Sequence, residues 1–331
     1  FQSPFGDHIL NNSGLAGFPA GTINRRNFEY IGISPQGQNG TTALSRGDWQ
    51  QAATEVLSET SPVNVGAQAF FDVSTGILTV NTEIYYTSTV TATQKLNIAI
   101  LENNLAGPQS GASFNPTDII SGPWSTTYNH RDVLRHLMEG QNGLQLSTTS
   151  SGTFIANTHT WNVPLNFGQA PSGYYPDIDP TNLEVIAFIS EGDQNIYTAF
   201  ETPVIVIFSN NYDVNLINVV ADDVVCSSEN DIKIVFRNYG NITLNSCDFN
   251  YSINGTSYVY NWTGNLSPGL EDTIILSNVL FTPQSSNTVT CTALNPNGQT
   301  DQNLTNNSVY NNFTHQDQSG NVIGGIQPGD I

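Results

Sequence analysis

The chain has 331 residues and a formal net charge of −20, and this acidity excludes nucleic acid and anionic membrane surfaces as partners because both would repel it. Hydrophobic residues make up 38% of the chain and charged residues 11%, which favours a globular protein of two domains with a fragment of a third. No run of 18 apolar residues occurs, so we expect no transmembrane segment.

The first feature along the chain is a turn in the stretch GLAGFPAGTINRR, residues 14–26. A Gly-Phe-Pro turn leads there into a short β-like run at Thr22 and Ile23, as in the turn of the thioredoxin fold that holds a cis proline. Pro19 is therefore a cis-proline candidate. The thioredoxin fold places a Cys-x-x-Cys pair beside this turn. The chain contains no such pair, so no redox activity follows from the turn.

One convincing helix is predicted within residues 43–60, ALSRGDWQQAATEVLSET. Its apolar residues fall on one face at helical spacing, and Ser45 is a natural N-cap with Asp48 three residues later. The tripeptide Arg46-Gly47-Asp48 also spells an integrin-binding motif. Such recognition needs an exposed loop tip, and the tripeptide occupies the first helical turn, so we interpret it as part of the helix start.

After Pro62 the pattern changes to the two-residue alternation of β-strands. The segments VNVGAQAFFDV, ILTVNTEIYYT and QKLNIAILEN are followed, after a long polar stretch, by GTFIANTHTWNVPL, LEVIAFISEG and NIYTAFETPVIVIF. We therefore expect an antiparallel β-sandwich over residues 61–208. Between these strands, TYNHRDVLRHLMEG (residues 127–140) fits either a helical face or an irregular strand.

The same segment holds the one dense group of ionisable residues in the chain. A functional interpretation makes it an anion site or an acid–base pair. The alternative is an ion-pair network that ties the long polar stretch to the sandwich, and we favour it because no nucleophile with a recognisable elbow lies nearby. The residues are His130, Arg131, Asp132, Arg135 and His136.

A weaker metal candidate follows in the stretch YYPDIDPTNLE. Asp177, Asp179 and Glu184 are carboxylates at spacings that allow calcium ligation through oxygen. The stretch lacks the spacing and the glycine of an EF-hand loop, so solvated turn acids are the favoured interpretation. Calcium is the one cofactor that the sequence suggests.

The segment SNNYD, residues 209–213, is the best domain boundary. Beyond it about seven short strands with turn signals between them predict an immunoglobulin-like sandwich over residues 209–315. One hairpin is marked by Asn254-Gly255. Residues 316–331, QDQSGNVIGGIQPGDI, have the composition of a linker or tail.

All three cysteines lie in this last third of the chain. In an immunoglobulin-like sandwich, the strands carrying Cys226 and Cys291 would begin near each other, so this pair is the first disulfide candidate and Cys247–Cys291 is its rival. Such a crosslink would add roughly 3 to 4 kcal/mol to stability. Nothing basic flanks these thiols, so they are not expected to be reactive. The tripeptide Asp272-Thr273-Ile274 resembles an O-glycosylation signal of Bacteroidota, which makes Thr273 a weak modification candidate.

Two family resemblances can be stated on these residues. The stretches GFPAGTINR, LNIAILENNLAGPQSG, YNHRDVLRHLMEG and LEVIAFISEGDQNIYTAFE resemble the outer-membrane protein 28 (Omp-28-like) family of Bacteroidota. VFRNYGNITLNSCDFNYSING, NWTGNLSPGLEDTIIL and LNPNGQTDQNLTNNS resemble a CARDB-type, cell-adhesion-related immunoglobulin-like domain. The resemblance implies that residues 1–60 are the C-terminal part of a thioredoxin-like α/β segment. The expected fold is mainly β, with two antiparallel β-sandwich domains after that segment.

The resemblance implies a location at the outer membrane or outside the cell. We expect a non-catalytic structural or adhesion protein that binds other surface proteins or glycans, in a homo-oligomer or a larger complex. One alternative is an accessory ligand-binding lipoprotein of an outer-membrane uptake or export complex. Another is a thiol oxidoreductase whose Cys-x-x-Cys lies upstream of Phe1. Independently of these alternatives, we expect the tail, residues 316–331, either to lead to a type IX secretion sorting domain or to end the chain.

Overall fold

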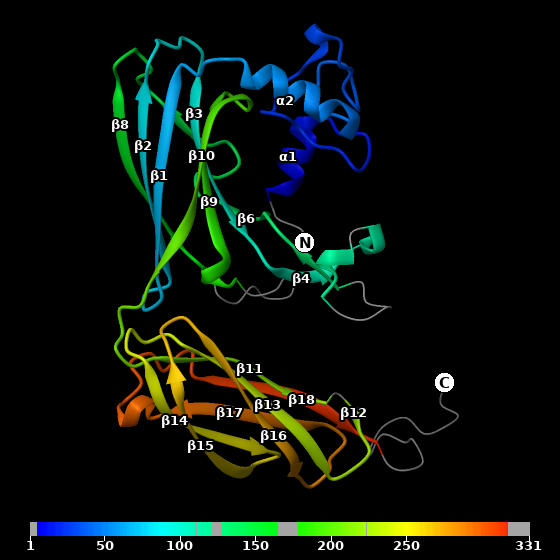
Figure 1. Cartoon of the computed structure of the whole chain (residues 1–331), viewed down its shortest axis with the longest axis vertical. Coiled ribbons are helices and arrows are strands. Elements are labelled where there is room, and N and C mark those ends of the chain that lie inside the picture. The colour runs from blue at the N-terminus through cyan, green and yellow to red at the C-terminus, as the bar shows by residue number, and fades with distance from the viewer. Residues whose placement is uncertain are drawn as a thin grey trace, which may run out of the picture. The chain divides into compact units, whose positions relative to one another are not determined.

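The computed structural model describes residues 5–109, 111–114, 116–120, 127–164, 178–222 and 224–316. The protein is mainly β, as the sequence predicts. It divides into two compact units (Figure 1). The first unit comprises Phe1–Phe71 and Gly76–Val206, and the second comprises Asp72–Thr75 and Ile207–Ile331. Within the described ranges, no helix combines the length and the apolar character needed to cross a bilayer.

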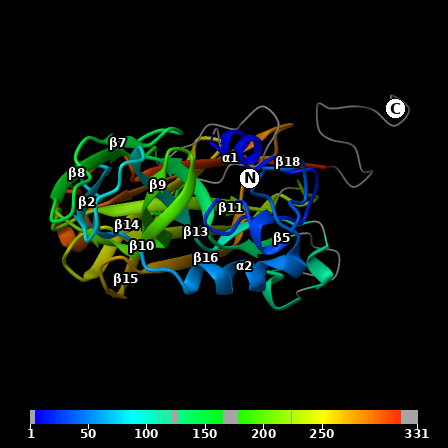
Figure 2. The same ribbon diagram turned by 90° about the horizontal axis from the view of Figure 1, so that it is seen from above.

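The first unit begins with a largely helical segment. It contains α1 (Gly6–Ser13) and α2 (Trp49–Leu57), and α2 follows a 3₁₀ turn over Arg46–Asp48, where the integrin-like tripeptide was expected to start the helix. Ala52 is fully buried, and Trp49 and Val56 pack beside it against Phe28 and Leu44, so most of the predicted helix face is used. Figures 1 and 2 both place the two helices on the side of the sheet away from β2 and β8.

The cis-proline candidate has the expected geometry, since the Phe18–Pro19 peptide bond is cis. The thioredoxin-like α/β segment finds no further support. In the described part of residues 1–60, the only β pairing is an isolated bridge between Gly21 and Leu44, and no strand forms. The reason lies in the sequence, because this stretch contains no two-residue alternation long enough to make a sheet.

One eight-stranded sheet forms the body of the first unit. Its order is β6-β3-β9-β10-β1-β2-β8, with β7 paired to β3, and a separate ribbon joins β4 to β5. Residues 133–137, which the sequence left open between helix and strand, form strand β6. The strands are β1 (Val63–Asp72), β2 (Ile77–Tyr86), β3 (Gln94–Glu102), β4 (Leu105–Pro108), β5 (Thr127–His130), β6 (Val133–Leu137), β7 (Leu144–Leu146), β8 (Phe154–Asn162), β9 (Leu183–Glu191) and β10 (Gln194–Ile207).

The sheet curls on itself, so the β-sandwich expected for residues 61–208 is built from one continuous sheet. The end strands β6 and β8 meet where His136 stacks on Trp161, with ring centroids 4.2 Å apart. The long strand β10 makes the sheet continuous because it pairs with β9 over Gln194–Pro203 and also borders β1. The alternating apolar residues of β1 and β2 face the interior of this curl, as their pattern predicts.

Strands β3 and β9 are buried on both faces. Their outer face is covered by a cluster of Ala99, Leu101, Leu137 and Phe188, against which Phe5 packs. This explains why QKLNIAIL and EVIAFIS are almost continuously apolar where an exposed face would need polar residues at every second position. The N-terminal segment therefore belongs to the core of the first unit.

The second unit is a sandwich of a three-stranded sheet, β11-β13-β16, and a five-stranded sheet, β12-β18-β17-β14-β15. Phe236, Phe249 and Trp262 meet in its core. Asn254 and Gly255 both have positive φ at the β14–β15 hairpin, which is the turn that Asn-Gly favours. The strands are β11 (Val214–Ala221), β12 (Val224–Val225), β13 (Glu229–Asn238), β14 (Leu244–Ile253), β15 (Thr256–Leu266), β16 (Glu271–Leu280), β17 (Asn287–Leu294) and β18 (Ser308–His315).

The predicted disulfide is absent, because all three cysteines are free thiols. Cys226 is exposed, whereas Cys247 and Cys291 lie buried on neighbouring strands. Register explains why the rival pair does not bridge. Tyr251 is the residue opposite Cys291, and Cys247 stands four positions further along β14, a separation of about 13 Å along a strand. The Cys247 thiol donates instead to the Leu294 carbonyl at 3.2 Å.

These thiols should differ sharply in reactivity. Burial raises the pKa of Cys247 and Cys291 to about 12, from 9.0, which lowers the thiolate fraction about 1,000-fold. We expect a thiol-specific dye to label one cysteine per native chain, at Cys226, and three after denaturation without reductant. A Cys226→Ser control should label none in the native state. If two of the three cysteines stayed unlabelled in the denatured wild-type chain, they would form a disulfide, and this result would contradict the structure.

Candidate functional site

The ionisable cluster predicted at residues 130–136 does not form a single site. Arg131 pairs with Asp118 at 2.9 Å on the surface, and Arg135 pairs with Glu102 at 2.9 Å in the interior. His136 stacks on Trp161, and the rings of His130 and Tyr128 meet edge to face at 5.4 Å. Asp132 sits in the β5–β6 turn with φ +53°. Because these side chains alternate along two strands, they point to different surroundings.

The Arg135–Glu102 pair is the structural centre of this region. The two side chains are 4% and 1% exposed. Glu102 also accepts a hydrogen bond from the backbone N–H of Asp179 at 2.7 Å. The pair thereby joins β3, β6 and the segment before β9.

Of the three calcium candidates, the structure describes Asp179 and Glu184. Asp179 caps a short 3₁₀ turn, Pro180–Asn182, by accepting hydrogen bonds from the backbone and hydroxyl of Thr181. Glu184 lies on β9, and Asp177 lies outside the described residues. Nowhere in the described part of the chain do three or more His, Cys, Asp or Glu side chains gather to hold a metal ion.

Sequence reasoning missed a hydrogen-bonded chain of Glu139, His159 and Thr82. His159 joins Glu139 through Nδ1 at 2.6 Å and Thr82 through Nε2 at 3.2 Å. The order of groups resembles that of an acid, a base and a hydroxyl nucleophile. The Thr82 residue is only 1% exposed, however, so its hydroxyl is closed to substrate. No spacing in the sequence indicates this group of three hydrogen-bonded side chains, because its members come from β2, β8 and the loop after β6.

The outer side of the five-stranded sheet in the second unit is a continuous neutral polar surface. We call it the Ser/Thr/Asn face. Asp248 is the one charged side chain among the described residues that point outward from β14, β15, β17 and β18. The face is built from Asn250, Ser252, Ser257, Asn261, Thr288, Thr290, Thr292, Ser308 and Asn312.

Hydrogen bonds between neighbouring strands hold these short side chains in place. Ser252 meets Thr290 at 2.8 Å, and Thr292 meets Ser308 at 3.1 Å. Thr288 donates to Asn312 at 2.8 Å. Each hydroxyl can still donate or accept toward the solvent side, because a hydroxyl offers one proton and two lone pairs. The Ser/Thr/Asn face is therefore an ordered surface of neutral hydrogen-bond donors and acceptors.

One exposed aromatic side chain projects from the Ser/Thr/Asn face. Tyr310 on β18 stands opposite Thr290 and is 71% exposed. Two other exposed apolar side chains point outward from the described part of this sheet. Val259 lies on β15, three strands away or about 14 Å, and Val224 lies on β12, where it pairs with Thr314 of β18. The modification candidate Thr273 is exposed on β16, in the other sheet, and is therefore not part of the face.

No family model and no curated protein matches the chain. Among solved structures, HBP35 of Porphyromonas gingivalis is similar over 93% of this chain and 79% of its own, with 12% identity and a TM-score of 0.45. A domain of the outer membrane lipoprotein Omp28 from the same organism matches over 44% of this chain and 98% of its own, with 14% identity and a TM-score of 0.28.

A CARDB domain from Pyrococcus furiosus, solved in complex with di-metal ions, is similar over 33% of this chain and 95% of its own. Its identity is 23% and its TM-score is 0.27. The Omp28 and CARDB resemblances stated from the sequence thus reappear among the solved structures as likenesses at the level of the fold. At these identities and TM-scores they assign no activity, ligand or partner.

Proposed function

We propose that this protein is a non-catalytic binding protein of a bacterial cell surface and that its second unit binds an uncharged saccharide on the Ser/Thr/Asn face. The observation that carries the proposal is the composition of this face. In a chain with a net charge of −20, its outward side chains are almost all neutral hydroxyls and amides. The surface location comes from the family resemblance of the sequence.

Saccharide chemistry fits this arrangement. Sugar hydroxyls both donate and accept hydrogen bonds, as do the hydroxyls and amides of the face. Binding them desolvates no ion, which keeps the cost low. The Tyr310 ring offers an apolar surface with a polar tip, onto which the C–H side of a sugar ring can pack.

A protein partner fits the same face less well. Protein interfaces concentrate their binding energy in a central group of large apolar, aromatic or arginine side chains. Here Tyr310 and Val259 stand about 14 Å apart with small polar residues between them, and the exposed Val224 pairs with Thr314, four residues along β18 from Tyr310. The face therefore lacks the compact apolar centre that protein association requires.

The proposal is tested on an array of uncharged gluco-, galacto- and manno-oligosaccharides with the full chain. We expect binding to at least one of them, and a loss of about tenfold or more in affinity for Tyr310→Ala. Tyr30→Ala is the matched control, because Tyr30 is 61% exposed but lies in the first unit. Both variants should melt at the wild-type temperature. Failure of every oligosaccharide to bind, or equal binding by Tyr310→Ala, would refute the saccharide assignment.

A further inference from the structure

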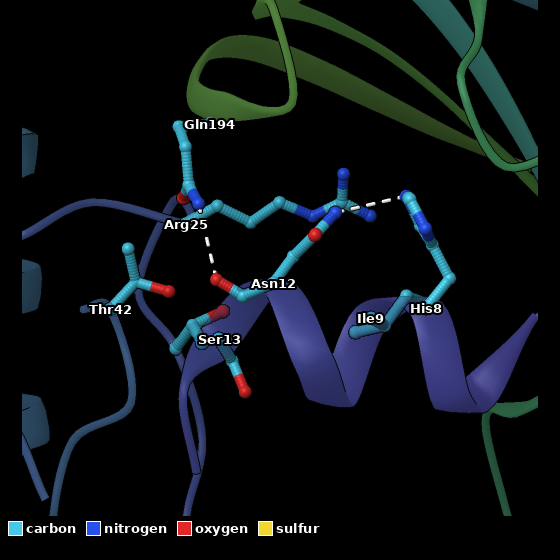
Figure 3. A pocket seen from close by; sticks show the side chains of 8 residues that line it. His8, Ile9, Asn12, Ser13, Arg25, Thr42 and Gln194 are labelled. Carbon is cyan, nitrogen blue, oxygen red and sulfur yellow. Dashed lines mark hydrogen bonds between the residues drawn. The ribbon is translucent and has the colours of Figure 1, made fainter. Parts of the chain in front are cut away.

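A small pocket in the first unit lies where three distant segments meet. It is bounded by α1, by the turn that carries Arg25, and by Gln194 at the start of β10. Figure 3 shows the Arg25 side chain running across the pocket, with its guanidinium beside the Asn12 amide and directed towards His8. The lining residues are His8, Ile9, Asn12, Ser13, Thr22, Arg25, Thr42 and Gln194.

The backbone of Arg25 is fixed in an unusual conformation. Asn24 and Arg25 both have positive φ, +50° and +47°, which costs energy for residues other than glycine. Three hydrogen bonds to β10 hold the turn: Asn195 N–H to the Arg25 carbonyl at 3.1 Å, Ile196 N–H to the Asn24 carbonyl at 2.8 Å, and Asn24 Nδ2 to the Ile196 carbonyl at 2.9 Å. The guanidinium is thus presented from a rigid base.

Arg25 differs from the other buried or half-buried basic residues in forming no ion pair with a described residue. Within the described residues, five of the eight basic side chains form ion pairs, namely those of Arg26, Lys95, Arg131, Arg135 and Arg237. Arg46 and Lys233 are exposed to water. Arg25 alone is half-buried without an ion pair. It lies over the Phe188 ring, 5.1 Å from the centroid.

The electrostatics of the pocket favour an anion. Burial lowers the pKa of Arg25, and the charge of Asp193 opposes this effect only in part. Asp193 itself is bound to Lys95 at 2.8 Å. A half-buried cation without an ion pair gains when an anion binds beside it, and a guanidinium matches a planar carboxylate with two parallel hydrogen bonds.

The neighbouring groups add a second requirement. Gln194 Nε2 donates to the Asn12 carbonyl at 3.2 Å, and Asn12 Nδ2 is paired with His8 Nε2 at 2.9 Å. Gln194 Oε1 is buried and has no hydrogen-bond partner in the structure. Figure 3 places the Gln194 amide beside the base of the Arg25 side chain, away from the guanidinium, so a donor that pairs with Oε1 would come from a separate part of a bound molecule.

We propose that this pocket is a carboxylate-binding site in which the Arg25 guanidinium receives the carboxylate. The carboxylate comes either from a small organic acid or from the C-terminus or an acidic side chain of a peptide. The site is independent of the Ser/Thr/Asn face, since the two belong to different units.

Ligand-observed NMR on the full chain tests this proposal. Acetate is the small probe, and acetamide is the neutral shape control. We expect acetate to bind in the millimolar range and acetamide at least about tenfold more weakly. Three tripeptides distinguish the peptide sources of the carboxylate from a small acid. They are a tripeptide with a free C-terminus, its amidated form, and a form with an internal glutamate.

The variants are Arg25→Gln and Arg25→Lys, with Arg46→Gln as the control that removes the same charge from an exposed site. Arg25→Gln should bind acetate at least about tenfold more weakly than the wild type. Arg25→Lys should lose part of the affinity, because it keeps the positive charge but not the paired N–H donors of the guanidinium. Arg46→Gln should bind acetate as the wild type does. If Arg25→Gln does not fold, the Arg25→Lys result and the acetamide comparison decide. Equal binding of acetate and acetamide, or an equal loss with Arg46→Gln, would overturn the site.

Discussion

Replacing Arg135 by methionine is expected to destabilise the first unit by about 3 to 5 kcal/mol. The Arg135–Glu102 pair is almost fully buried, and removal of the cation would leave the Glu102 carboxylate in the interior without its ion-pair partner. The measurement is urea unfolding of the full chain, with the transition of the first unit assigned by hydrogen exchange of β3.

Two further variants separate a buried ion pair from a simple loss of contacts. Arg131→Met removes the surface pair with Asp118, where Arg131 is 64% exposed, and should cost less than about 1 kcal/mol. The double variant Arg135→Met with Glu102→Met should regain most of the lost stability, because no charge is then left buried. If Arg135→Met cost no more than Arg131→Met, the buried pair would not hold these strands together.

The second unit should lose stability as the pH rises between about 4 and 6. Burial, together with the nearby charge of Asp213, raises the pKa of Asp301 to about 6, although hydrogen bonds from Asn303 and Val214 oppose the rise. Burial raises the pKa of Asp213 as well. The folded state then holds protons that the unfolded state has released, so stability is full below the unfolded pKa of 3.8 and is lost as the pH rises to about 6.

The shift of Asp301 corresponds to about 3 kcal/mol. About 2 kcal/mol of this falls between pH 4.5 and pH 7. Thermal unfolding at these two pH values measures it in the wild type, in Asp301→Asn, and in Glu229→Gln as an exposed carboxylate control in the same unit. Asp301→Asn is expected to remove most of the Asp301 contribution from the difference in stability between the two pH values, whereas Glu229→Gln should leave this difference unchanged. A wild-type difference that Asp301→Asn does not alter would contradict the assignment to this carboxylate.

Local features were predictable because they depend on residues close together in the sequence. The alternation in β1 and β2, the Asn254-Gly255 turn and the buried face of α2 all follow from spacing within a few residues. The immunoglobulin-like second unit was predictable for the same reason, since its short strands are separated by clear turn signals.

The remaining features depend on contacts between distant segments. The curl of the first sheet rests on the stacking of His136 and Trp161, which nothing in their spacing announces. The disulfide prediction failed because it assumed strand positions, and a shift of four residues in register separates Cys247 from Cys291. The Arg25 pocket joins α1 to β10 across more than half of the chain, so no local pattern could reveal it.

The central claim is that the Ser/Thr/Asn face binds an uncharged saccharide. Amide hydrogen exchange of the full chain, with and without the tightest-binding oligosaccharide from the array, tests it most directly. We predict slower exchange confined to the strands of the face, with the largest change around Tyr310 and Thr290, and no change in the sheet of β11, β13 and β16. Protection elsewhere with none on β17 and β18, or no protection at saturating saccharide, would contradict the account.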